Sequence, residues 1–255
     1  MKSRLIFSTL AFCAIAFATV SEPRAEPLEH FNSILAEIDK QSDFGTKDFA
    51  ATNSVVVYRP DKAPETIKAQ VFRRDYKSQF VIVVLDPSYK RGQGYLQADE
   101  NVWFYDPESG QFSHTNLKDN FQDSDTKNGD FNKSTYAVDY DVTAETEERL
   151  GKYDCWVLEL AAKNDAVAYP FMKIWVTKDS HLMLKAEDYS LTKRLMRTVL
   201  YPSYTKVAEH LLPTRVIFID NLTQGNRTEV TRSDLSLSSL PDSLFTKSYL
   251  QRVNR

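Results

Sequence analysis

The chain has 255 residues, of which 42% are hydrophobic, 26% charged and 12% aromatic, so it can bury the core of one large or two small domains. Its 7 Gly and 10 Pro argue against collagen-like, low-complexity and Gly-rich phosphate-loop proteins. A formal net charge of −3 gives no basic footprint for nucleic acid. The 15 Phe, 13 Tyr and 3 Trp suit curved sheets and apolar pockets.

Residues 1–25 have the pattern of a secretory signal peptide. Lys2 and Arg4 precede an apolar run over residues 5–20, and Ala16-Phe17-Ala18 provides an A-x-A cleavage motif. The alternative is an uncleaved anchor, although the run is slightly short for a membrane span. We expect the chain to be exported, with cleavage between residues 18 and 25, which leaves residues 26–255 as a single domain.

The two cysteines suggest neither lipidation nor a disulfide. Cys13 lies in the apolar run, but Phe12 occupies a position where a lipoprotein signal needs a small residue, so lipid anchoring through Cys13 is disfavoured. Cys155 is then alone in the mature chain and cannot form an internal disulfide. Its strand-like surroundings predict a small core side chain.

The first structural element after the leader is an amphipathic helix over Pro27 to Lys40. Its apolar stripe consists of Leu28, Phe31, Ile34, Leu35 and Ile38. A polar connection is expected over residues 43–50.

Two series of short strands follow, because the apolar pattern changes to a period of two. The first series is expected at Ser54–Arg59, Ile67–Arg74, Gln79–Leu85, Gly94–Ala98, Asn101–Tyr105 and Gln111–Asn116. The second is expected at Tyr153–Ala161, Phe171–Thr177, Leu182–Ser190, Leu195–Tyr201, Arg215–Asn221 and Arg227–Leu235. Strands at this spacing without intervening helices indicate antiparallel meanders.

Between the two meanders, residues 118–133 are predicted to form a solvated acidic loop, because their spacing does not fit an EF-hand. Thr143 to Leu150 suggests a short helix with acidic residues at its positive end. A last short helix is expected over Asp242 to Gln251.

A flat sheet of this width would expose its edges and one apolar face, so it must form a barrel, a sandwich or a curved sheet. Runs such as Phe80–Leu85 are apolar at successive positions, which indicates burial on both faces. Periodicity alone leaves two alternatives equally open. Either one face of the strands lines a cavity that helices plug, or side chains fill the interior and no cavity exists.

No catalytic or metal-binding motif is found. The four histidines, His30, His114, His181 and His210, are isolated, and no P-loop, G-x-S-x-G or H-E-x-x-H pattern occurs. A carboxylate pair that meets only in the fold stays open. The basic sets Arg73-Arg74 and Lys193-Arg194 with Arg197 suggest solvated faces, or else a steering patch for an anionic head group. No metal or cofactor is expected.

Several segments, in order, resemble the LolA-like family of outer-membrane lipoprotein-sorting proteins. They are Asp86–Leu96, Asn101–Pro107, Tyr153–Leu160, Lys173–Val176, Leu212–Val216, and Leu240–Thr246 with Tyr249-Leu250. The resemblance implies an incomplete antiparallel β-barrel, a curved sheet of about 11–12 strands closed by helices around a hydrophobic cavity. Residues 121–136 depart from the family pattern, which affects the shape of the lid.

The resemblance also implies a periplasmic carrier that shields lipid or lipoprotein acyl chains and transfers no catalytic residue. We expect the cavity wall to include Val81, Val83, Trp103, Tyr105, Trp156, Leu158, Ile174 and Phe218. The displaceable lid would include Leu28, Phe31, Leu35 and Ile38. Partners would be acyl chains and an inner-membrane transporter of the resistance-nodulation-division kind or a lipoprotein-release complex. The alternatives are an adaptor of such a transport complex, without a ligand of its own, and an exported hydrolase.

Overall fold

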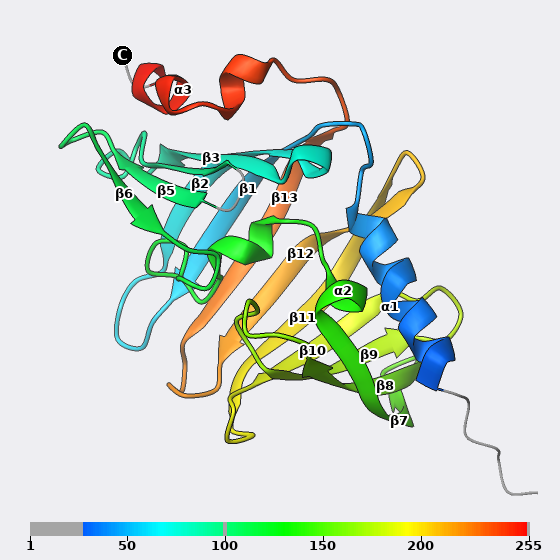
Figure 1. The fold of residues 1–255 in the computed structure, drawn as a ribbon. Coiled ribbons are helices and arrows are strands. Elements are labelled where there is room, and N and C mark those ends of the chain that lie inside the picture. Colours follow the sequence, from blue (N-terminus) through cyan, green and yellow to red (C-terminus); the bar gives the residue numbers. More distant parts are fainter. Residues whose placement is uncertain (1–27, 99–100, 254–255) are drawn as a thin grey trace, which may run out of the picture.

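The computed structural model describes residues 28–98 and 101–253 (Figure 1). The predicted signal peptide and Cys13 lie outside the described residues. The strands are β1 (Phe49–Tyr58), β2 (Glu65–Arg74), β3 (Gln79–Asp86), β4 (Gly94–Ala98), β5 (Asn101–Asp106), β6 (Gln111–Thr115), β7 (Tyr140–Leu150), β8 (Tyr153–Ala162), β9 (Phe171–Thr177), β10 (Met183–Tyr189), β11 (Leu195–Val207), β12 (His210–Asp220) and β13 (Arg227–Ser236). The helices are α1 (Leu28–Ser42), α2 (Tyr136–Asp139) and α3 (Lys247–Arg252), with 3-10 turns η1 (Asp75–Lys77), η2 (Asn128–Phe131) and η3 (Asp242–Phe245).

Within the described residues the strands form one 13-stranded sheet in the order β6-β5-β4-β3-β2-β1-β13-β12-β11-β10-β9-β8-β7. Neighbouring strands pair antiparallel throughout, and β6 and β7 are the two edges. The sheet curves but does not close (Figure 1). The expected open, curved antiparallel sheet is confirmed.

The path of the chain explains how one side of the sheet becomes covered. The first strand, β1, lies near the centre of the sheet, and β2 to β6 follow in order out to one edge. The chain then crosses to the opposite edge, where β7 begins. Residues 116–139, here called the crossing segment, must therefore span the open side of the sheet. Figure 1 shows this segment and α1 lying across the curved sheet.

The two faces of the sheet carry different covers, because successive strand residues point to opposite sides. On the inner face, the apolar side chains pack against Phe31, Ile34, Leu35 and Ile38 of α1. On the outer face, β3, β4 and β5 pack against the C-terminal segment, residues 240–252. That packing depends on Gly94, because a Cβ there would lie 2.5 Å from a methyl group of Leu250.

The prediction of a helix at Thr143 to Leu150 is wrong, because these residues belong to the edge strand β7. Its Glu-rich sequence has no strong β-propensity, but pairing with β8 along its whole length overrides that preference. The predicted C-terminal helix is divided into η3 and α3. Thr246 separates them, and its side chain caps α3 by accepting a hydrogen bond from the Tyr249 N–H at 3.2 Å.

The crossing segment is also more than the solvated loop that its composition predicted. Phe121 and Phe131 are buried in the inner-face core, and Asn128 is fully buried beside them. The two phenylalanines indicate burial, although the acidic residues around them suggest an exposed loop. This segment is therefore a packed cover of the sheet.

Candidate ligand cavity

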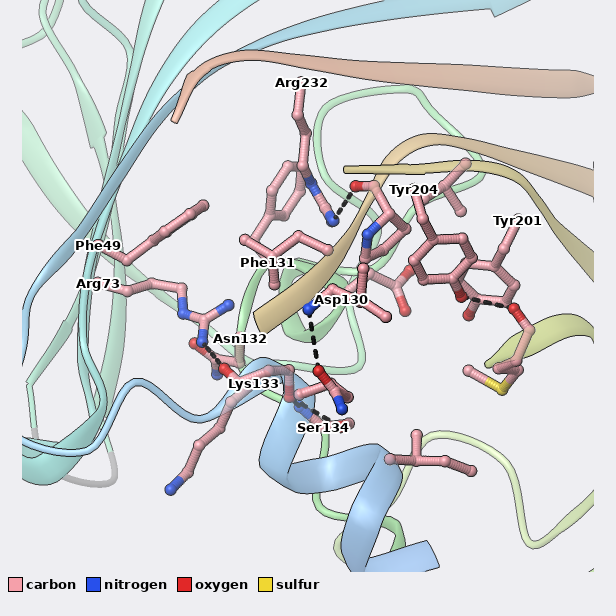
Figure 2. A pocket seen from close by; sticks show the side chains of 18 of the residues that line it. Phe49, Arg73, Asp130, Phe131, Asn132, Lys133, Ser134, Tyr201, Tyr204 and Arg232 are labelled. Atoms are coloured by element: carbon pink, nitrogen blue, oxygen red, sulfur yellow. Dashed lines mark hydrogen bonds between the residues drawn. The ribbon is translucent and has the colours of Figure 1, made fainter. Parts of the chain in front are cut away.

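A cavity of about 190 Å³ lies between the inner face of the sheet, the C-terminal half of α1 and the crossing segment (Figure 2). Its apolar lining includes Ile38 of α1, Phe131 of the crossing segment, and Val216 and Phe218 of β12. The mixture of an apolar lining and a few polar groups is typical of small-molecule sites.

One part of the polar lining comes from the strands, and another part comes from α1 and the crossing segment. Asn53 of β1 and Arg232 of β13 are direct partners in the register of these two strands. Arg232 Nη1 donates to the carbonyl oxygen of Pro213 at 3.0 Å. Tyr204 donates its hydroxyl to the carbonyl oxygen of Met183 at 2.5 Å, and Figure 2 shows it near Tyr201 at the cavity wall.

Hydrogen bonds tie the end of α1 to the crossing segment. The Asp39 carboxylate accepts hydrogen bonds from the backbone N–H groups of Tyr136 and Ala137 at 2.9 and 2.8 Å, at the start of α2. The Ser42 hydroxyl lies 2.8 Å from that of Ser134. The contacts between these two elements therefore include hydrogen bonds, for which water is an alternative partner.

A second cavity, of about 400 Å³, lies on the other side of the same segment and shares Gly129, Asp130 and residues 132–134 and 136 with the first. At its wall, Arg197 Nε donates to Asp188 at 2.7 Å, and its two terminal nitrogens donate to Asp130 at 2.6 and 3.2 Å. Burial raises the pKa of Asp188. The ion pair fixes the crossing segment against β10 and β11.

Neither the solvated-face interpretation nor the steering-patch interpretation describes Arg73, Arg74 and Arg197, because all three are buried and paired with carboxylates. Arg73 binds Asp75 and also donates to the Ser42 carbonyl oxygen at 2.7 Å, at the end of α1. Adjacent basic residues on a strand do not share a face, and here each points to a different cover.

Four of the expected wall residues lie on the inner face. Trp156 contacts Phe31 of α1 edge-on, with ring centroids 5.2 Å apart. Leu158 and Ile174 are partners between β8 and β9 in the same core, and Phe218 lines the cavity.

The other four, Val81, Val83, Trp103 and Tyr105, lie on the outer face. Val81, Val83 and Tyr105 pack in the cluster beneath the C-terminal segment, and the Lys247 ammonium lies over the Trp103 ring. The apolar pattern does not distinguish the two faces of β3 and β5, because both sides of these strands are apolar. The eight residues therefore do not form one wall.

The expected lid residues lie on α1. Phe31, Leu35 and Ile38 are buried against the inner face, and Leu28 is 45% exposed at the start of the helix. The polar residues Asn53, Tyr201, Tyr204 and Arg232 were not among the predicted site residues. A usable signal existed at Asn53, which interrupts an otherwise apolar inward series with Val55 and Val57.

Within the described residues, no group of three or more His, Cys, Asp or Glu side chains could hold a metal ion. Cys155 is a buried free thiol on the outer side of β8, and its burial raises its pKa. A raised pKa disfavours the nucleophilic thiolate. No helix in the described part of the chain is long and apolar enough to cross a membrane.

Proteins of known structure share this fold. A family model for uncharacterized proteins matches residues 76–252. A LolA superfamily protein from Nitrosomonas europaea is similar in structure, with a TM-score of 0.74 and 28% identity over 85% of this chain and 97% of that one. No curated protein matches the chain.

Two further crystal structures share the fold at lower sequence identity. A DUF1329 family protein from Desulfovibrio piger has a TM-score of 0.80 and 22% identity, covering 89% of this chain and 100% of that one. A putative outer membrane lipoprotein-sorting protein domain from Vibrio parahaemolyticus has a TM-score of 0.77 and 19% identity, with the same coverage. This chain belongs to the LolA-like family.

Proposed function

We propose that this protein is a periplasmic carrier that shields an acyl chain of a lipid or lipoprotein between the inner face of its sheet and a displaceable cover. The cover consists of α1 and the crossing segment. The observation that carries the proposal is the cavity beneath these two elements, which are joined to each other by the polar contacts of Asp39 and Ser42. In this proposal residues 1–25 direct export and are removed.

Burial of the chain supplies the binding free energy. Each methylene removed from water contributes about 0.8 kcal/mol, before the cost of ordering the chain and the cover. The cavity of about 190 Å³ is below the ~300–1,000 Å³ of drug-sized ligand sites, so the cover must move to admit a chain. Withdrawal of residues 129–136 would join the two cavities that now share them.

The proposed wall then consists of Trp156, Leu158, Ile174 and Phe218, and Phe31, Leu35 and Ile38 form the apolar side of the lid. The similarity to a putative outer membrane lipoprotein-sorting protein domain from Vibrio parahaemolyticus agrees with lipoprotein or lipid as the cargo. The donor and acceptor would be an inner-membrane complex and the outer membrane.

The test is native mass spectrometry of protein purified from a periplasmic extract without detergent, followed by lipid extraction. We expect a bound acyl species that denaturation releases and that Leu35→Asp lacks, because a carboxylate at this fully buried site detaches α1 from the inner face. Ala36→Asp, on the exposed side of the same helix, is the matched control and should retain the ligand. A protein that is ligand-free as purified and stays so after incubation with phospholipid and lipopeptide would contradict the proposal.

A further inference from the structure

The inner face contains a polar pair that the apolar-carrier account does not require. Asn53 and Arg232 lie opposite each other on the central strands β1 and β13, and both line the cavity of about 190 Å³. Asn53 is only 2% exposed, and among the described residues its side chain forms no hydrogen bond; its Oδ1 is buried without a partner. An unpaired buried amide is unfavourable, which points to a partner of another molecule.

Arg232 is the cation of this cavity that lacks a carboxylate partner in the described part of the chain. Its one hydrogen bond goes to the carbonyl oxygen of Pro213. The neighbouring Arg73 is neutralised by Asp75, at 3.0 and 2.8 Å, and Lys133 by Asp43, at 2.6 Å. Burial, reinforced by the positive charge of Arg73, lowers the pKa of Arg232 to about 10.

One carboxylate of the lining, Asp130, could oppose an anion there. Its charge is already engaged, because both of its oxygens accept hydrogen bonds from Arg197. The nearby tyrosines Tyr201 and Tyr204 are neutral, since burial raises their pKa values. The polar end of the cavity therefore has an excess of positive charge and of unused donors.

We propose that Arg232 and Asn53 bind the anionic head group, a phosphate or carboxylate, of a single-chain amphiphile whose chain lies along the apolar lining. This inference rests on the proposed function and names the chemical class of the cargo. The guanidinium donates to the anion with a charge-assisted bond, Asn53 Nδ2 donates a second hydrogen bond, and the unpartnered Asn53 Oδ1 accepts one from a protonated oxygen of the head group. Phe131, Val216 and Phe218 are the apolar surfaces next to this site.

Calorimetric titration of the purified protein with decyl phosphate, decanol and inorganic phosphate tests the proposal. We expect decyl phosphate to bind at least tenfold more tightly than either of the others. Arg232→Gln should weaken decyl phosphate binding by about 10- to 100-fold and leave decanol binding unchanged, since a hydrogen bond to a charged group is lost. Arg232→Lys should restore part of the affinity.

Two further variants separate binding from folding. Arg215→Gln on β12 removes a half-exposed arginine outside the cavity and should bind as the wild type does. Asn53→Leu should weaken decyl phosphate binding by about tenfold without lowering the unfolding temperature, because it removes an amide that has no partner in the protein.

The binding results distinguish the head-group inference from the proposed carrier function. Equal affinity of decyl phosphate and decanol, unaffected by Arg232→Gln, would overturn the head-group inference while leaving the carrier function intact. Inorganic phosphate binding as tightly as decyl phosphate would show a free-anion site and overturn the amphiphile assignment. Failure of both decyl compounds to bind the wild type would contradict the proposed function as well.

Discussion

Different contacts hold the covers on the two faces of the sheet. On the outer face, residues 240–252 pack through Leu244, Phe245 and Leu250 into a cluster of strand side chains. Arg74 anchors this segment, because its guanidinium binds Asp48 through two hydrogen bonds of 2.9 Å and also contacts Asp242 and the Leu240 carbonyl oxygen.

The inner cover combines apolar packing of α1 with polar bonds to the crossing segment, and cavities remain beneath it. The two covers thus differ in packing, because the outer interface is filled and cavities remain beneath the inner cover. An arginine of the sheet holds each cover, Arg74 on the outer face and Arg197, through Asp130, on the inner face, so the cavities are what distinguish the two interfaces.

The largest expected effect is on the outer anchor. Arg74→Met leaves the buried Asp48 carboxylate without its partner, and we expect the free energy of unfolding to fall by about 3–5 kcal/mol in urea denaturation. Arg91→Met removes an exposed pair with Asp86 and should lower it by less than about 1 kcal/mol. Acyl-chain uptake by the folded Arg74→Met protein should be unchanged; a loss of uptake with full stability would reverse the roles of the two covers.

An intermediate effect distinguishes a filled face from one with a cavity. Val83→Phe overpacks the outer cluster and should lower the free energy of unfolding by about 1–3 kcal/mol without changing decyl phosphate binding. Val216→Phe places the same extra volume in the cavity, so it should affect stability less and weaken binding more. Thermal denaturation measures the stability of both variants, and calorimetry measures their affinity for decyl phosphate. A larger loss of stability in Val216→Phe, or a larger loss of affinity in Val83→Phe, would contradict this assignment of the two faces.

The smallest expected effect is on the pH dependence of stability, and it involves one carboxylate at each cover. Burial raises the pKa of Asp39 in the inner tether, whereas hydrogen bonds from Arg74 lower the pKa of Asp48 in the outer anchor. The contribution of Asp39 to stability is therefore present below its ordinary pKa, near 4, and is lost as the pH rises through the raised value. That of Asp48 is present above its ordinary pKa and is lost as the pH falls through the lowered value.

NMR titration of the two side-chain carboxyl carbons measures these values directly. We expect Asp39 to titrate above the ordinary value and Asp48 below it. Asp48→Asn should reduce the acid-induced loss of stability. Titration of both groups at the ordinary value would contradict the difference in their surroundings.

Twelve of the strands could be located from the sequence, because alternation of apolar residues survives on a sheet covered on both sides. The strand β7 could not, since its exposed glutamates carry no period-two apolar signal and its conformation depends on pairing with β8. Which strand residues face inward was equally hidden for Val81 and Val83, within a run that is apolar on both faces.

The candidate site was predictable only in its apolar part. The apolar stripe of α1 predicted that Phe31, Leu35 and Ile38 are buried, but the position of the crossing segment depends on the strand order, which places β6 and β7 at opposite edges. Asn53 and Arg232 are far apart in the sequence and meet only through the pairing of β1 with β13. The apolar pattern of one strand does not indicate which other strand pairs with it.

The most direct test of the central claim is a reversible lock across the inner cover. The Ser42 and Ser134 hydroxyl oxygens lie 2.8 Å apart, so Ser42→Cys with Ser134→Cys places two sulfurs within reach of a disulfide, while Cys155 stays buried. We predict that the oxidised protein does not take up decyl phosphate and that reduction restores wild-type uptake. Equal uptake by the oxidised and reduced forms would show that α1 and the crossing segment need not separate, and would contradict the account.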